Sequence, residues 1–185
     1  MRMPMPTLLI TLAILLLIVI GLQKFYLLRP KIELTGELIA RLQELAKRSL
    51  ETLDVPVAAL LLYKKEIIGE GFNTVFRNGK AGEHAEINAI SSAIASVGME
   101  KFLALDRSQL VLISTFEPCL MCSGAFVSYN IRTVYFMEEK DAAYLLKEAR
   151  LLARYMFRRT LVRNRGEQVA LFKLHPHYPG RSDPS

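Results

Sequence analysis

The stretch STFEPCLMCSGAF, Ser114–Phe126, holds the only two cysteines of this 185-residue chain, Cys119 and Cys122. It overlaps the end of the apolar run QLVLIST, residues 109–115, which indicates a buried strand. Pro118 stands where a helix would begin, and CLMCSGAFVSYN after it has helical composition. The stretch therefore predicts a strand that leads directly into a helix whose first turn carries both thiols.

Both sulfurs can reach one metal ion, because positions three apart lie on neighbouring faces of a helix. A helix N-terminus also lowers thiol pKa values and favours the thiolate that a metal binds. A redox pair has the same spacing. A structural disulfide between such close neighbours is unfavourable, so two cysteines at this spacing indicate a reducing compartment.

A second segment, HAE at His84–Glu86, begins the predicted helix EHAEINAISSAIASVG, which ends at Gly98. If both helices start at one edge of a sheet, His84 joins the two thiolates, and three ligands with an open fourth position are typical of a catalytic zinc site. Glu86 is then placed to carry protons for a zinc-bound water. A redox pair would need neither His84 nor Glu86. A structural zinc site would need a fourth protein ligand, and the other histidines, His175 and His177, lie in the terminal tail.

The motifs HAEINAI and FEPCLMCSGA, with GEGFN upstream, resemble the zinc-dependent cytidine deaminase-like superfamily and its H-x-E and P-C-x-x-C signature. They are most similar to its branch of nucleoside, tRNA adenosine and guanine deaminases, and the resemblance extends from Glu37 to about Met137. It implies a three-layer α/β/α sandwich around a mixed sheet of about five strands. It also implies hydrolytic deamination, in which a zinc-bound hydroxide attacks the amino-bearing ring carbon, Glu86 shuttles protons and ammonia leaves.

The same resemblance implies further roles. His84, Cys119 and Cys122 would hold Zn²⁺, Asn73 would hydrogen-bond the substrate, and the backbone amide of Ala85 would face the base. The chain would form a homodimer.

The remaining pattern also favours an α/β layer sandwich, because strands alternate with helices. We expect an amphipathic helix from Thr35 to about Leu53 and a two-strand hairpin that turns at Lys64 and Lys65. The other expected elements are a loop TVFRNGKAG, a strand RTVYFM, a long helix over about 141–159, and a last strand or packed tail QVALFKL.

The amino-terminal run TLLITLAILLLIVIGL, residues 7–22, predicts one transmembrane helix, since no charge occurs from Met3 to Gln23. A cleaved signal peptide would need a small-x-small cleavage site, and a buried core helix would show a polar face. The predicted organisation is an anchor over 1–28, a connector over 29–36, a deaminase domain over 37–174 and a mobile tail over 175–185. Flanking cations, which include Lys24, Arg29, Lys31 and Arg41, place the domain of this single-pass membrane protein on the cytoplasmic side.

The motifs leave the substrate open. A free nucleobase, nucleoside or nucleotide is the leading expectation, and tRNA adenosine-to-inosine deamination is the alternative. TVFRNGKAGE lacks the D-P-[ST] lead that tRNA-editing relatives often show, and the long helix after RTVYFM also differs from them. The net charge of +6 favours an anionic partner. The basic stripe Lys147, Arg150, Arg154 and Arg158 fits a solvated face of an amphipathic helix better than an RNA contact, and contact with an anionic lipid surface is a third interpretation. A membrane-tethered zinc-binding interaction module without turnover is the alternative from another class.

Overall fold

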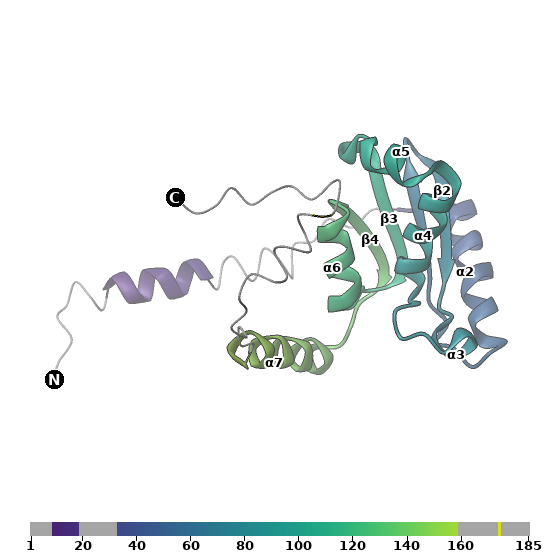
Figure 1. The fold of residues 1–185 in the computed structure, drawn as a ribbon. Coiled ribbons are helices and arrows are strands. Elements are labelled where there is room, and N and C mark those ends of the chain that lie inside the picture. Colours follow the sequence, from purple (N-terminus) through teal and green to yellow (C-terminus); the bar gives the residue numbers. More distant parts are fainter. Residues whose placement is uncertain (1–8, 19–32, 159–173, 175–185) are drawn as a thin grey trace.

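The computed structural model describes residues 9–18, 33–158 and 174. Its centre is a mixed four-stranded sheet of order β2-β1-β3-β4 (Figure 1). β1 (Ala58–Tyr63) pairs antiparallel with β2 (Glu66–Phe72) and with β3 (Leu110–Phe116), while β4 (Thr133–Glu138) runs parallel to β3. The predicted α/β class and mixed sheet are confirmed. The described part of the chain has four strands where about five were expected, and QVALFKL, all but Leu174, lies outside it.

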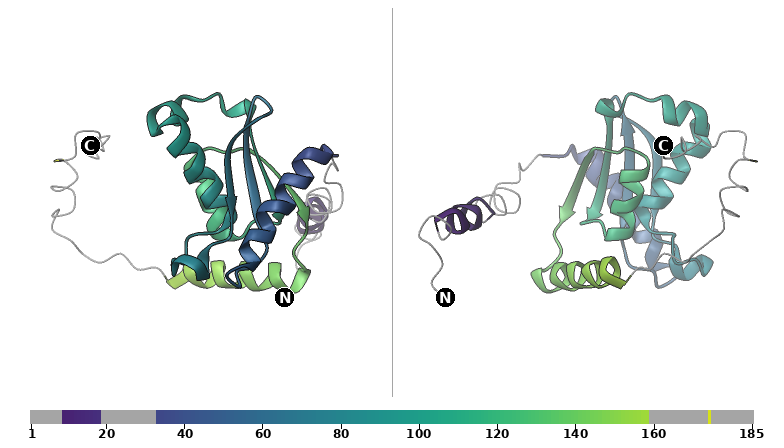
Figure 2. Two further views of the ribbon diagram at one scale, coloured as in Figure 1. Left: turned by 90° about the vertical axis from the view of Figure 1, so that its right-hand side faces the viewer. Right: turned by 60° about the vertical axis from the view of Figure 1, so that its left-hand side comes forward.

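Helices cover both faces of this sheet. α2 (Gly36–Leu50) lies on one side of the strands, and α4 (Ala85–Val97) lies on the other side with α6 (Leu120–Ser128) (Figure 2). The alternation of β1 explains the layering: Leu60 and Leu62 pack in the core under α2, and Leu61 packs with residues of α4 and α6. The three-layer arrangement expected from the sequence is present.

Several predicted boundaries are confirmed. Thr35 caps α2, because its hydroxyl accepts a hydrogen bond from the Leu38 amide at 3.4 Å. α4 ends at Gly98, whose φ of 86° suits glycine. Lys64 and Lys65 both have positive φ, 52° and 71°, which is the backbone of a two-residue hairpin turn.

Other predictions were wrong in detail. The segment TVFRNGKAG was expected to be a loop, but it contains the short helix α3 (Val75–Asn78). The carboxylate of Asp54 explains this helix, since it accepts hydrogen bonds from the amides of Phe76 at 2.7 Å and Arg77 at 3.1 Å. α5 (Met99–Ala104) and the 3-10 turn η1 (Arg107–Gln109) were not predicted, and α2 ends at Leu50 rather than near Leu53.

Two glycines of β2 bring α4 close to the sheet. A Cβ on Gly69 would stand 2.2 Å from the carbonyl oxygen of Ala89, and a Cβ on Gly71 would stand 2.2 Å from that of Ala85. Only strands without side chains at these positions allow the helix to pack so closely. The first turn of α4, which contains His84 and Glu86 at its start, is therefore seated directly on β2.

α7 (Ala142–Arg158) confirms the long helix predicted after β4. It lies across the end of the molecule where α6 begins (Figure 1). The described residues include no helix with the length and apolar character needed to cross a bilayer. Residues 9–18 are helical, and the rest of the predicted anchor, 1–8 and 19–28, falls outside the described part.

Candidate metal centre and cavity

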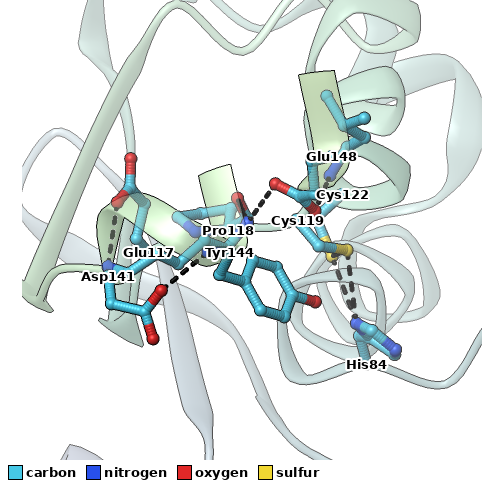
Figure 3. Close-up of polar contacts among 10 residues, drawn as sticks. His84, Glu117, Pro118, Cys119, Cys122, Asp141, Tyr144 and Glu148 are labelled. Atoms are coloured by element: carbon cyan, nitrogen blue, oxygen red, sulfur yellow. Dashed lines mark hydrogen bonds and ion pairs between the residues drawn. The ribbon is translucent and has the colours of Figure 1, made fainter. Parts of the chain in front are cut away.

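The three predicted metal ligands meet at the starts of two helices. His84 is the N-cap residue of α4, Cys119 is the N-cap residue of α6, and Cys122 lies in the first turn of α6. Cys119 Sγ lies 3.6 Å from His84 Nδ1 and 3.6 Å from Cys122 Sγ, and Cys122 Sγ lies 3.7 Å from His84 Nδ1 (Figure 3). The structure thus brings together residues that are 38 positions apart in the chain.

These distances fit a zinc ion. Tetrahedral ligands at Zn–S distances of about 2.3 Å and Zn–N distances of about 2.0 Å stand about 3.5 to 3.8 Å from one another. The three ligand atoms match that spacing on every edge. The sulfurs are too far apart for a disulfide, and both cysteines are free. The donor set of one imidazole and two thiols fits zinc and leaves one tetrahedral position open.

A hydrogen bond joins the sulfurs of Cys119 and Cys122. This hydrogen bond lowers the pKa of Cys119 to about 5. The pKa of Cys122 is raised by the same hydrogen bond, by burial and by the nearby Glu86 carboxylate. Because a metal binds thiolates, zinc binding would release any proton that remains on the two sulfurs and leave both as ligands.

Glu86 lies beside the ligands, but its carboxylate is suited to proton transfer rather than to metal binding. It is only 3% exposed, and its Oε1 accepts a hydrogen bond from the hydroxyl of Ser114 and its Oε2 one from the thiol of Cys122, each at 3.4 Å. Ser114 follows Leu112 on the α4 face of β3, so the strand alternation places its hydroxyl under Glu86. Burial raises the pKa of Glu86, although the hydrogen bonds it accepts oppose this. A carboxyl with a raised pKa is a better proton acceptor than an ordinary one, which suits a group that carries protons.

A cavity of about 290 Å³ opens over these groups. Two sequence-predicted residues, Asn73 and Ala85, lie on its wall with His84, Glu86 and Cys119. Asn73 is 8% exposed, and its side-chain oxygen has no hydrogen-bond partner among the residues that the structure describes. A buried acceptor without a partner is costly unless a ligand satisfies it, and this oxygen belongs to a residue that lines the cavity.

Sequence reasoning missed part of the cavity wall. Lys140 and Tyr144 line it from the start of α7, and the remaining wall is formed by Val55, Val57, Phe116 and Glu117. Figure 3 shows Tyr144 extending from α7 toward the metal ligands. Amphipathic spacing indicated α7 as a helix, but nothing in that spacing showed that its first turn would reach the metal loop, the segment from Glu117 to Leu120. The basic stripe Lys147, Arg150, Arg154 and Arg158 is exposed on the same helix, and none of these four lines the cavity.

Comparisons with known proteins agree with this geometry. Residues 33–138 match the family described as the cytidine and deoxycytidylate deaminase zinc-binding region. The chain is 38% identical over 93 residues to a subunit of the tRNA-specific adenosine deaminase of Schizosaccharomyces pombe, and 33% identical over 94 residues to tRNA-specific adenosine deaminase 2 of Xenopus laevis. Each match covers 50% of this chain, but only 23% of the yeast protein and 54% of the frog protein.

Among solved structures, the fold is similar to guanine deaminase from Bacillus subtilis, with a TM-score of 0.60 and 23% sequence identity. That similarity covers 76% of this chain and 93% of the Bacillus chain. At 23% identity it shows that the two chains share a fold. The matched family region contains His84, Glu86, Cys119 and Cys122, and their arrangement is that of a zinc-dependent deaminating centre. The chain belongs to the cytidine and deoxycytidylate deaminase zinc-binding family.

Proposed function

We propose that this chain is a hydrolase that deaminates a nucleobase, free or as part of a nucleoside or nucleotide, with Zn²⁺ as its cofactor. The observation that carries the proposal is the buried Glu86 carboxyl, which stands beside three zinc-compatible ligand atoms on the wall of a base-sized cavity. The overall reaction adds water to the amino-bearing ring carbon, breaks its bond to nitrogen, and yields a carbonyl base and ammonia.

Zinc bound by His84, Cys119 and Cys122 would supply one thing that the side chains cannot, a water whose pKa is lowered to near neutrality. The protein supplies the proton transfers. The Glu86 carboxylate takes a proton from the attacking water and gives it to the ring nitrogen or to the departing amine. Its raised pKa favours the step in which it holds the proton, because burial disfavours the charged form. Ser114, which donates to Oε1, holds the carboxyl in position.

The cavity wall supports a planar, polar substrate. The free side-chain oxygen of Asn73 would accept a hydrogen bond from substrate, and the Ala85 amide would face the base edge. Tyr144, Val57 and Phe116 present the apolar surface on which a ring can lie. The volume of about 290 Å³ lies at the small end of ligand pockets, which admits one base.

A second candidate is the deamination of adenosine in tRNA. The relatives reported above, named as tRNA-specific adenosine deaminases, favour it. An enzyme that acts on RNA inserts one base into the pocket and holds the backbone outside, so the cavity volume suits both candidates. The exposed Lys147, Arg150 and Arg154 of α7 would meet phosphates in this case.

Ammonia release separates these functions. The zinc-loaded full chain should release ammonia from at least one of cytosine, adenine, guanine or their nucleosides and nucleotides. Incubation with total tRNA, followed by nucleoside analysis for inosine, tests the second candidate. Zinc binding without ammonia release and without inosine in tRNA would refute both and leave a zinc-binding interaction module.

We also infer that the uncharged segment over residues 7–22 anchors the chain in a membrane, with the deaminase domain on the cytoplasmic side. The absence of charge over that length and the cations after it support this. Carbonate-resistant membrane association of the full chain, lost when residues 1–32 are removed, is the expected result. The homodimer implied by the family resemblance stays a prediction for light scattering of the domain.

A further inference from the structure

The backbone on both sides of the zinc ligand Cys119 is held by one ion pair from the neighbourhood of α7. The Lys140 amine donates a hydrogen bond to the carbonyl of Pro118 at 2.8 Å and contacts Glu148 Oε2 at 2.8 Å. The other oxygen of Glu148 accepts a hydrogen bond from the Leu120 amide at 3.3 Å. Pro118 and Leu120 are the two neighbours of Cys119, so the Lys140–Glu148 ion pair forms hydrogen bonds with the peptide groups before and after the ligand.

Lys140 is buried in this pair, and Glu148 is partly buried. The Lys140 side chain is 3% exposed and that of Glu148 is 17% exposed. A lysine this far from water keeps its charge only where partners compensate it. Its amine has two oxygen partners, and it also lies 5.0 Å from the centre of the Tyr144 ring. The ion pair of Lys80 with Glu83, by contrast, leaves one partner mostly in solvent, with 71% of the Lys80 side chain exposed.

The start of α6 explains why an outside group is needed there. A helix leaves its first amides without partners, and the side chain of the N-cap residue commonly satisfies one of them. Cys119 occupies the N-cap position of α6 but makes no side-chain capping bond in the described structure, because its sulfur faces His84 and Cys122. Glu148 does the capping from α7 instead. Cys119 is thus free to bind a metal, because a residue of another helix caps the start of α6 in its place.

A further contact extends the attachment. The backbone amide of Lys140 donates to the Glu117 carboxylate at 3.0 Å, and the Glu117 amide donates to the carbonyl of Glu138 at 2.8 Å. The metal loop from Glu117 to Leu120 is thus tied to the end of β4 and to α7 at several successive positions. This attachment is specific to the loop, since α7 has no buried residue of its own.

We propose that Lys140 and Glu148 are a positioning pair for the zinc site, which fixes the Cys119 thiolate at its distance from Cys122 and His84. The proposal goes beyond deamination by assigning α7 a part in metal binding, and it rests on the proposed function only in taking zinc as the metal. Outer partners of metal ligands typically change metal affinity about 10- to 100-fold when they are lost. The expected effect here is about a ten-fold weaker zinc affinity for either single variant.

The test uses the full chain with zinc or with Co²⁺, whose visible and thiolate charge-transfer absorption reports the ligand geometry without any turnover. The variants are Lys140→Met and Glu148→Gln, measured by zinc competition against a chromophoric chelator and by the Co²⁺ spectrum. Glu148→Gln keeps size and an acceptor for the Leu120 amide but leaves the lysine uncompensated. The matched control is Glu70→Gln, which breaks the ion pair of Glu70 with Arg41 on the α2 side of the sheet.

We expect weaker zinc binding and a changed Co²⁺ spectrum in both variants, with neither change in the control. Unaltered zinc affinity and an unaltered spectrum, with thermal stability lowered as in Glu70→Gln, would show that the pair is merely structural and overturn the proposal. If a single variant fails to fold, the double variant Lys140→Met with Glu148→Leu removes both charges, which buried pairs often tolerate. It should fold and still bind zinc about ten-fold more weakly, and wild-type affinity in it would overturn the proposal. A chain that shows these metal effects but no deamination would refute only the proposed function.

Discussion

The carbonyl oxygen of Ala85 occupies the space that a side chain on Gly71 would need, at 2.2 Å from the position of its Cβ. This closeness fixes how deeply the first turn of α4 sits on β2. His84 and Glu86 flank Ala85 in the chain, so the fit of a glycine in a strand sets the height of a zinc ligand and a catalytic carboxyl above the sheet.

Gly71→Ala should therefore damage both fold and metal site. Overpacking a well-packed core costs about 1–3 kcal/mol, and the shift of α4 would move His84 away from the two sulfurs. Thermal unfolding and zinc competition measure the two effects. Gly36→Ala is the matched control, because a Cβ at Gly36 meets nothing within 4 Å. Wild-type zinc affinity in Gly71→Ala would contradict this account of the packing.

Glu86→Gln should leave the fold and the zinc content unchanged but reduce ammonia release about 10²- to 10⁴-fold, the usual contribution of a general acid-base group. The amide keeps the size of the carboxyl, so the hydrogen bond from Ser114 persists, but it cannot accept the proton. Zinc analysis and a coupled ammonia assay on the same preparation check both halves. Full activity with Gln at this position would rule out the proton transfer assigned to Glu86.

Removal of zinc should lower thermal stability as well as abolish activity. Cys122 is fully buried in the core between the sheet and α6, so the metal binds to the native packing and stabilises it by mass action. A chelator should lower the melting temperature, and added Zn²⁺ should restore both stability and turnover. In Cys122→Ser the melting temperature should respond far less to zinc, and an undiminished response would mean that zinc binds elsewhere.

Tyr144→Ala should weaken substrate binding without affecting zinc. The ring forms part of the cavity wall, and aromatic contacts are worth about 0.5–1.5 kcal/mol, so KM should rise several-fold while kcat changes little. Tyr144→Phe separates the ring from the hydroxyl. If KM rises equally in both variants, the hydroxyl rather than the ring holds the substrate.

Asp54 should make the fold sensitive to acid. Burial disfavours its charge, but hydrogen bonds from the Phe76 and Arg77 amides and the Thr52 hydroxyl outweigh that, so its pKa lies below the ordinary 3.8. A lowered carboxyl pKa contributes stability that is present above pH 3.8 and is lost as the pH falls through the folded-state pKa.

Melting temperatures of the wild type and Asp54→Asn, measured from pH 7 to pH 3 at equal zinc, provide the check. The variant should be less stable near neutral pH, and the gap should narrow in acid. Loss of zinc in acid affects both proteins alike, so it drops out of the comparison. A gap that stays constant down to pH 3 would contradict the role given to this carboxylate.

The metal site could be predicted from the sequence because its ligands lie in two short segments at helix starts, where spacing determines direction. His84, Cys119, Cys122 and Glu86 meet as expected. The α/β layering and the hairpin of β1 with β2 also followed from local pattern, since strands alternate with helices along the chain and Lys64 and Lys65 mark the turn. Local pattern could not reveal Lys140 and Glu148, since the first looks like an ordinary connector residue and the second like an ordinary member of a charged helix, and only tertiary packing brings them together away from solvent. α3 escaped notice because its cap, Asp54, lies 22 residues away from the amide of Phe76.

The pairing of β3 with β1, which sets Ser114 opposite Ala59, also bears on how the chain folds. A slip of one residue would turn Ser114 to the α2 side and carry the start of α6 along with it, so the cysteines would miss His84. Tight zinc binding therefore requires the correct strand register, and a chain whose strands have paired in another register should bind zinc weakly. Zinc binding should therefore stabilise only the chain with the correct register, and the ion should bind late in refolding, after β3 has paired with β1.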